Sequence, residues 1–279
     1  RWEMHEALHA VGIATEVSHH EVATAGQGEI AMKYAPLVEK GDHFQWYKYI
    51  VRNVARDNGM AATFMPKPIF GDNGTGMHVH QSLWKDGNPL FFDQSNYGGL
   101  SELARHYVGG LLKHAPAVLA FAAPSTNSYK RLVPGFEAPI NLVYSARNRS
   151  AVIRISTYET SAASKRIEFR APDPTCNPYL AFSAMLLAGL DGIKNKIEPP
   201  DPIDKNIYDL PEDEAAKLAK VPGSLDESLA ALKGDHEFLT ASGVFAEKYI
   251  QDYLDLKNGE IKALSMRPTP YEYELYFDA

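Results

Sequence analysis

Two histidines and a serine alternate along one short stretch, directly after a glycine-rich turn. Residues 71–77 read GDNGTGM, and His78, His80 and Ser82 follow at a spacing of two. Because side chains of a strand alternate between its faces, these polar groups would line one surface. Histidines so placed can bind a metal or face solvent, and the residues alone leave both readings open. The turn lacks the final Gly-Lys-Ser/Thr of a Walker motif, so its glycines are weak evidence for phosphate binding.

Two carboxylates flank a second turn of small residues. Glu21 and Glu29 enclose residues 22–28 (VATAGQG), and in a hairpin they would face each other across neighbouring strands. A carboxylate pair suits a hard divalent cation. A pair of solvated strand ends, with His19 and His20 beside them, is the alternative that the residues leave open.

Charged residues also alternate later in the chain. Arg166, Glu168 and Arg170 are separated by apolar residues, so a carboxylate and two guanidinium groups would project from one face of a strand. Taken alone, this segment is more simply explained as an exposed strand with salt bridges.

Four arginines lie on a turn-rich stretch and two expected strands of an otherwise acidic chain: Arg131, Arg147, Arg149 and Arg154. Guanidinium groups match phosphate and carboxylate oxygens, although structural ion pairs with Glu137, Glu159 and Glu168 would also explain them. Together with the carboxylates and histidines, they point to metal-assisted phosphoryl chemistry with a nucleotide and a carboxylate substrate.

Strands and helices that could position these groups are interspersed. The patterns predict strands at 14–22, 28–34, 76–83, 140–145, 151–157 and 165–171, and helices at 42–58, 100–114, 178–196, 225–232 and 244–256. Several strands follow one another with no helix between, so we expect an α+β fold with a mainly antiparallel sheet backed by helices. Residues 198–203 (EPPDPI) form a rigid connector, and the region from 198 to 279 is expected to be peripheral and helical.

Composition limits the functional classes. The chain has 279 residues, 45% of them hydrophobic, and a net charge of −7, which gives no reason to expect nucleic-acid or membrane binding. Its single cysteine, Cys176, suits a reducing, cytoplasmic location. The first eight residues already have helical spacing, so the sequence is expected to begin inside an element.

A series of motifs resembles type I glutamine synthetase, in order along the chain. The matching segments are residues 21–29 (EVATAGQGE), 65–68 (MPKP), 71–80 (GDNGTGMHVH), 127–137 (NSYKRLVPGFE), 148–150 (NRS), 177–180 (NPYL) and 267–276 (RPTPYEYELY). The resemblance implies synthesis of glutamine from glutamate, ammonium and ATP through γ-glutamyl phosphate, with two Mg²⁺ or Mn²⁺ ions per site. It also places the sheet within the family's catalytic barrel.

By this resemblance, Glu21 and Glu29 would hold one ion, and His78 and Glu168 the ion that engages ATP. Arginines and a flap complete the implied site. Arg149 and Arg154 would bind phosphates, and Glu137 would close over glutamate and help to deprotonate ammonium. The residues implied to bind glutamate are Asn73, Gly74, Arg131, Glu137 and Arg170, and those implied to bind the nucleotide are Tyr34, His80, Ser82, Arg149, Arg154 and Arg166.

The sequence departs from the family in two respects. A nucleotide-contacting lysine of the relatives falls at Ala163, where Lys165 is a nearby substitute. The family's N-terminal β-grasp domain, its Glu-x-Glu ligand pair and an aspartate loop from the neighbouring subunit have no counterpart in these 279 residues. We therefore expect the 279-residue chain alone to have little or no synthetase activity, which a γ-glutamyl transfer assay on the purified chain tests.

Two further features carry implications for partners. Tyr208 resembles a tyrosine that an adenylylating enzyme modifies in some bacterial members, although an ordinary loop tyrosine is the alternative. The aromatic residues between 270 and 277 resemble a tail that joins two hexameric rings into a dodecamer; in a single chain we expect them to pack on its own core. A γ-glutamyl-polyamine or other amine ligase and a non-catalytic relative are the rival functions.

Overall fold

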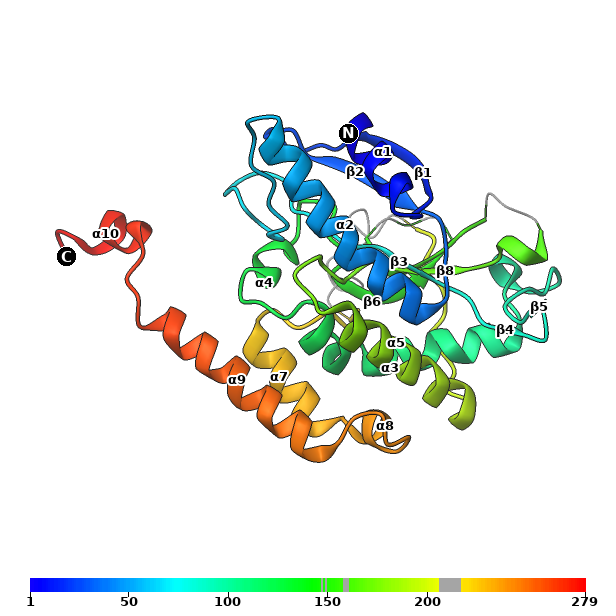
Figure 1. Cartoon of the computed structure of the whole chain (residues 1–279). Coiled ribbons are helices and arrows are strands. Elements are labelled where there is room, and N and C mark those ends of the chain that lie inside the picture. Colours follow the sequence, from blue (N-terminus) through cyan, green and yellow to red (C-terminus); the bar gives the residue numbers. More distant parts are fainter. Residues whose placement is uncertain (147, 149, 158–160, 206–216) are drawn as a thin grey trace.

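The computed structural model describes residues 1–146, 148, 150–157, 161–205 and 217–279. Its largest sheet has four strands in the order β3 (Val79–Gln81), β8 (Ile167–Phe169), β7 (Ala151–Ile155) and β6 (Asn141–Ser145). Two long helices, α3 (Glu102–Ala122) and α5 (Pro178–Asn195), pack against each other beside this sheet (Figure 1). One core cluster contains buried residues of both helices and of strands β7 and β8, so it joins the two layers.

Glycines allow α3 and α5 to approach backbone to backbone. A Cβ atom on Gly110 of α3 would lie 2.1 Å from the Ala188 carbonyl oxygen of α5. A Cβ atom on Gly192 of α5 would lie 2.2 Å from the His106 carbonyl oxygen of α3. The helix expected at 100–114 also continues through Pro116 to Ala122. The Pro116 carbonyl accepts a hydrogen bond from the Ser228 hydroxyl at 2.7 Å, which ties this part of α3 to a later helix.

Among the described residues the main sheet is mixed: the expectation of a mainly antiparallel sheet is confirmed for two of its strand pairings and not for the third. Strand β8 pairs antiparallel with β3 and β7, but β6 and β7 are parallel. Consecutive strands with a short connection usually form an antiparallel pair. Here side-chain bonds hold the connection: Ser145 Oγ accepts from Asn148 N at 2.9 Å, and Asn148 Oδ1 accepts from Ser150 N at 2.9 Å. In the resulting register Asn141, at the start of β6, is beside Ala151, at the start of β7. Among the described residues no closed barrel is formed.

The expected hairpin is present as β1 (Thr15–His20) and β2 (Gly28–Met32), which pair antiparallel with His19 opposite Glu29. It lies beside α1 (Trp2–Ala10) and α2 (Leu37–Asp57). Leu8, Ile13 and Ile50 form a small separate core among these elements. This core fixes the hairpin that carries Glu21 and Glu29 at its ends.

Short elements connect these layers. They are β4 (Trp84–Lys85), β5 (Asn88–Pro89), the 3-10 helices η1 (Tyr97–Gly99) and η2 (Ala162–Ser164), and α4 (Ser128–Arg131). In the part of the chain that the structure describes, no helix combines the length and apolar character needed to cross a bilayer.

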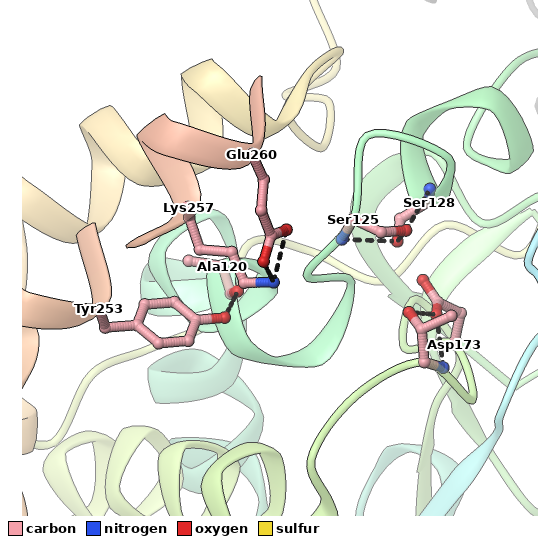
Figure 2. Close-up of polar contacts among 8 residues, drawn as sticks. Ala120, Ser125, Ser128, Asp173, Tyr253, Lys257 and Glu260 are labelled. Carbon is pink, nitrogen blue, oxygen red and sulfur yellow. Dashed lines mark hydrogen bonds and ion pairs between the residues drawn. The ribbon is translucent and has the colours of Figure 1, made fainter. Parts of the chain in front are cut away.

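Helices α7 (Leu225–Gly234), α8 (Glu237–Thr240) and α9 (Glu247–Ser265) follow the connector. Buried Leu225, Leu229 and Leu232 attach α7 to the main core. Helix α9 lies outside α7, and its Tyr253 hydroxyl donates to the Ala120 carbonyl of α3 at 2.6 Å (Figure 2). All five helices expected from the sequence are therefore present, with shifted ends.

The aromatic tail does not pack on the core of this chain, so that expectation was wrong. Helix α10 (Pro270–Tyr276) stands away from the body beyond the end of α9 (Figure 1). Tyr271 is 62% exposed and Phe277 is 77% exposed. A capping box between Thr269 and Glu272 satisfies backbone donors at the start of this helix.

Candidate metal and substrate site

His19, Glu21 and Glu29 gather at the end of the β1–β2 hairpin where residues 21–27 connect its two strands. One ligand atom from each lies within 4.8 Å of the other two. His19 Nδ1 is 3.1 Å from Glu21 Oε1, and His19 Nε2 is 3.9 Å from Glu29 Oε1. The predicted proximity of the two glutamates is thus present, and His19 is a candidate ligand that the sequence interpretation missed. Its position two residues before Glu21 was the available signal, because alternate residues of a strand share a face.

The electrostatics of this cluster favour a cation. Partial burial raises the pKa of Glu29, and the negative charges of Glu21 and Glu168 add to the effect, although His19 opposes it. Carboxylates that repel one another are stabilised by a positive ion placed among them. The chemistry of the three side chains therefore fits a hard divalent cation.

Glu168 is the centre of a second cluster on the main sheet. Its Oε1 atom lies 3.0 Å from His78 Nδ1 and 3.0 Å from an Arg170 guanidinium nitrogen, and its Oε2 atom lies 2.5 Å from Arg154 Nε. Strand register explains the contact with Arg154, which is directly opposite Glu168 across β7 and β8. Glu168 and Arg170 are buried, so the reading of this segment as an exposed strand was wrong.

Protonation in this cluster is defined by its neighbours. Burial by itself raises the pKa of Glu168, but the hydrogen bond from His78 and the charges of Arg170 and Arg154 lower it to about 2. Loss of water around the imidazole lowers the pKa of His78 to about 4. At neutral pH a carboxylate therefore accepts from a neutral imidazole, whose proton must be on Nδ1. The Nε2 lone pair of His78 remains available as a ligand.

Arg131 lies beneath the glycine-rich loop. It is 5% exposed, and its guanidinium donates to the carbonyls of Arg170, Ala171 and Pro172 at 3.0, 2.8 and 3.2 Å. Burial lowers the pKa of Arg131 to about 10, so it stays charged at neutral pH. A Cβ atom on Gly76 would lie 2.4 Å from its guanidinium, which explains glycine at that position. Arg131 thus packs against the glycine-rich loop and connects it to residues 170–172.

The hairpin turn holds the glycine-rich loop from the other side. Thr24 donates to Asp72 Oδ2 from its backbone nitrogen at 2.9 Å and from its hydroxyl at 2.7 Å. Gln27 Nε2 donates to the Gly74 carbonyl at 3.0 Å and to the Thr75 hydroxyl at 2.9 Å. The loop expected to bind glutamate through Asn73 and Gly74 is therefore fastened directly to the hairpin that carries Glu21 and Glu29.

Residues expected to contact the nucleotide are more dispersed. His80 is opposite Glu168 in the β3–β8 register, and burial lowers its pKa. Ser82 accepts from Trp84 Nε1 at 3.1 Å, and the Arg166 guanidinium donates to the Ser164 carbonyl at 3.0 Å. Tyr34 is 94% exposed. The structure thus brings His80 to the Glu168 cluster and leaves Tyr34 in solvent.

Lys165 does not replace the lysine expected at Ala163. Its ammonium group is buried and donates to the carbonyls of Gly98 and Ser156 at 2.8 and 2.9 Å. The exposed Ala163 lies in η2. The idea that Lys165 substitutes at the nucleotide was therefore wrong, because its charge is used to join two segments of backbone.

The structure describes some of the remaining predicted site residues and leaves others out. Glu137 is exposed and has a φ of 56°. Four predicted positions lie outside the described residues: Arg147, Arg149, Glu159 and Tyr208. Of the ion pairs considered for the arginines, the pair between Arg154 and Glu168 is present.

These features define an α+β domain in which carboxylates, histidines and arginines gather as candidate ligands for cations and anions. The chain belongs to the glutamine synthetase family: residues 1–276 match the glutamine synthetase catalytic domain. It is 59% identical over its whole length to the glutamine synthetase of Frankia alni, of which it covers 59%. The chain therefore spans about three-fifths of the length of this curated relative.

Solved structures agree with this assignment. The chain resembles an electron cryomicroscopy structure of Plasmodium falciparum glutamine synthetase with a TM-score of 0.89 and 35% identity, covering 99% of this chain and 60% of that one. It also resembles a GmaS/ADP complex with a TM-score of 0.87 and 32% identity, covering 99% and 63%. The predicted family is confirmed.

Proposed function

We propose that this chain is the catalytic domain of a cytoplasmic enzyme that makes glutamine from glutamate, ammonium and ATP through γ-glutamyl phosphate. Residues 1–279 would act as one unit, with 198–279 as its peripheral helical region. The observation that carries the proposal is the geometry of two ligand groups: His19, Glu21 and Glu29 place ligand atoms within 4.8 Å of one another, and His78 lies 3.0 Å from Glu168. The Frankia alni relative, named glutamine synthetase, supports the same activity.

Two groups of side chains fit two Mg²⁺ or Mn²⁺ ions. Glu21 and Glu29, with His19 beside them, would hold one ion, and His78 and Glu168 the other. Such ions, when bound, would neutralise phosphate charge. The neutral form of His78 and the ionised form of Glu168 are the protonation states that ligation needs.

Arginines in this arrangement would bind the anionic parts of both substrates. Arg154, with Arg149, would offset charge on the transferring phosphoryl group. Arg170 and Arg131 would orient the glutamate carboxylates, Arg131 with its guanidinium already fixed by three carbonyls. Asn73 and Gly74 would receive the amino end of glutamate.

Glu137 would take a proton from ammonium, so that ammonia attacks the acyl phosphate, and its turn would exclude water. For the nucleotide, the proposed contacts come from residues on β3, near β8 and after β2: Tyr34, His80, Ser82 and Arg166. The exposure of Tyr34 agrees with a role in stacking on a ligand, since an aromatic face in solvent gains from being covered.

We also propose assembly into a dodecamer of two hexameric rings, with adenylylation at Tyr208 as a means of control. The exposed aromatic tail supports an interface outside this chain, because monomers seldom leave so large an apolar surface uncovered. Neighbouring subunits would complete each site in such an assembly.

Coupled formation of ADP and glutamine tests the activity. The complete protein that contains these residues is supplied with glutamate, ATP, Mg²⁺ or Mn²⁺, and either ammonium or a series of amines. We expect ADP and glutamine in about equal amounts with ammonium, and a Glu21→Gln variant that needs a higher Mn²⁺ concentration. Preference for a polyamine would replace the proposal by the amine-ligase alternative. Absence of nucleotide turnover with every amine would favour the non-catalytic alternative instead.

A further inference from the structure

Lys67 lies where three segments of the site meet. Its backbone N–H donates to Asn127 Oδ1 at 2.8 Å, and its carbonyl accepts from Asn127 Nδ2 at 3.0 Å. Asn127 is the residue before α4, the helix that ends at Arg131. The main chain of Lys67 is thus fixed to the helix that carries the arginine beneath the glycine-rich loop.

The side chain of Lys67 reaches two other segments. Its ammonium group donates to the Asp72 carbonyl, at the start of the Asn73–Gly74 pair. The same group lies 3.6 Å from the centroid of the Phe136 ring. Partial burial lowers the pKa of Lys67, because its ammonium group has lost some of its surrounding water. One ammonium group therefore connects the glycine-rich loop to the turn at 134–137.

That turn has few other contacts with the part of the chain that the structure describes. Pro134, Gly135 and Glu137 are exposed, and Phe136 is half-buried. Glu137 has a φ of 56°, a left-handed conformation that costs energy for a residue other than glycine. A conformation of this kind persists only where neighbouring contacts hold it, and the ring of Phe136 is the adjacent point of contact.

We propose that Lys67 is a positioning residue that holds the 134–137 turn over the glycine-rich loop and so places Glu137 for its reaction. The proposal rests on the proposed function, in which Glu137 deprotonates ammonium and the turn excludes water. With the turn displaced, water attacks the acyl carbon of γ-glutamyl phosphate. The bond from that carbon to the phosphate oxygen breaks, glutamate and inorganic phosphate leave, and ATP is consumed without forming glutamine.

The ratio of ADP to glutamine formed by the complete protein measures this loss directly. We expect a ratio of about one for the wild type, the stoichiometry of coupled ligation. Removal of a cation–π contact shifts the equilibrium between the closed and the displaced turn by a few-fold to about thirtyfold. Lys67→Met should therefore raise the ratio of ADP to glutamine severalfold. Phe136→Leu should do the same. Lys67→Arg should restore a ratio close to the wild-type value, because a guanidinium also donates and stacks on a ring.

A matched control is available at Lys257, which pairs with Glu260 and lies 5.9 Å from the Tyr253 ring, on α9 (Figure 2). Lys257→Met should leave the ratio unchanged. If Lys67→Met instead lowered thermal stability and total turnover but kept the wild-type ratio, Lys67 would be a structural residue and the proposal would be overturned. A Lys67→Met protein with the wild-type stability, turnover and ratio of ADP to glutamine would also overturn the proposal.

Hydrogen–deuterium exchange separates this proposal from the proposed function. Lys67→Met should accelerate exchange in residues 133–138 at least threefold while α5 keeps its wild-type rate, with or without substrates. If the wild type formed no ADP with any amine but exchange changed as expected, the proposed function would fail and the positioning role would stand. Unaltered exchange at 133–138 would overturn the positioning role whatever the activity.

Discussion

Replacement of Arg131 by methionine tests whether this buried arginine supports the site as the geometry indicates. The guanidinium makes three hydrogen bonds to the carbonyls of residues 170–172, which directly follow β8. Methionine fills part of the same volume but donates nothing, so these carbonyls lose their charged donor. Asp173, whose negative charge supports the charged form of Arg131, also loses its opposite charge.

The expected loss of stability follows from these contacts. Breaking a buried charged interaction from one side costs about 3–5 kcal/mol, because the partners left behind stay desolvated. Three separate hydrogen bonds to a charged donor, at about 1.5–3 kcal/mol each, would give a larger sum, but such contributions are not additive. We therefore expect Arg131→Met to lower the free energy of unfolding by about 4 kcal/mol. Arg131→Lys should lose less, since an ammonium group can still reach one or two carbonyls.

Urea unfolding at pH 7 measures this difference, and the KM for glutamate is measured on the same variants. Arg105→Met is the matched control, because Arg105 forms an exposed ion pair with Glu198 and its removal should cost less than about 1 kcal/mol. The reasoning would be refuted by an Arg131→Met protein as stable as the control with only its glutamate KM raised. Such a result would mean that the three carbonyl bonds contribute nothing net and that Arg131 serves the ligand alone.

Two other predictions concern the core of the site and of the fold. When the metal-free protein folds, the pKa of Glu168 falls from 4.5 to about 2. Its ionised form therefore stabilises the fold above pH 4.5, and this stabilisation is lost as the pH falls toward 2. Urea unfolding should show Glu168→Gln destabilised by about 3 kcal/mol at pH 6, and by less at pH 3. A Cβ atom at Gly110 would force α3 away from the Ala188 carbonyl, so Gly110→Ala should lower the free energy of unfolding by about 3 kcal/mol or more. Gly259 in α9 has open space around it, so Gly259→Ala should raise the free energy of unfolding by up to about 1 kcal/mol. Thermal unfolding of both variants would contradict this prediction if their midpoints moved alike.

The sequence predicted the positions of helices and strands better than the way in which the strands pair. Residue spacing indicated the hairpin at Glu21 and Glu29 and all five long helices, because periodicity reflects which positions of one element share a face. It did not reveal that β6 and β7 run parallel, because alternation gives the faces of a strand and not the direction of its neighbour. The local residue pattern does not predict the direction in which neighbouring strands run.

Burial of charge was the second limit. Glu168 and Lys165 belong to a segment that looks like an exposed charged strand, yet both are buried. Glu168 pairs with Arg154 on the neighbouring strand, and Lys165 donates to the carbonyl of the distant Gly98. Alternation shows that side chains share a face but not whether another layer covers it. His19 was missed for a related reason: Glu29, on the neighbouring strand, completes its surroundings.

The tail shows the same limit at the level of the chain. Aromatic residues between 270 and 277 indicate that a surface is meant to be covered, but not whether the cover belongs to the same polypeptide. In the structure α10 has a capping box at its start while its aromatic side chains remain exposed. An exposed apolar surface of this kind is available to another molecule. In the proposed dodecamer a neighbouring subunit would cover it, and the apolar area removed from water would favour the contact and help to stabilise a helix that is too short to be stable alone.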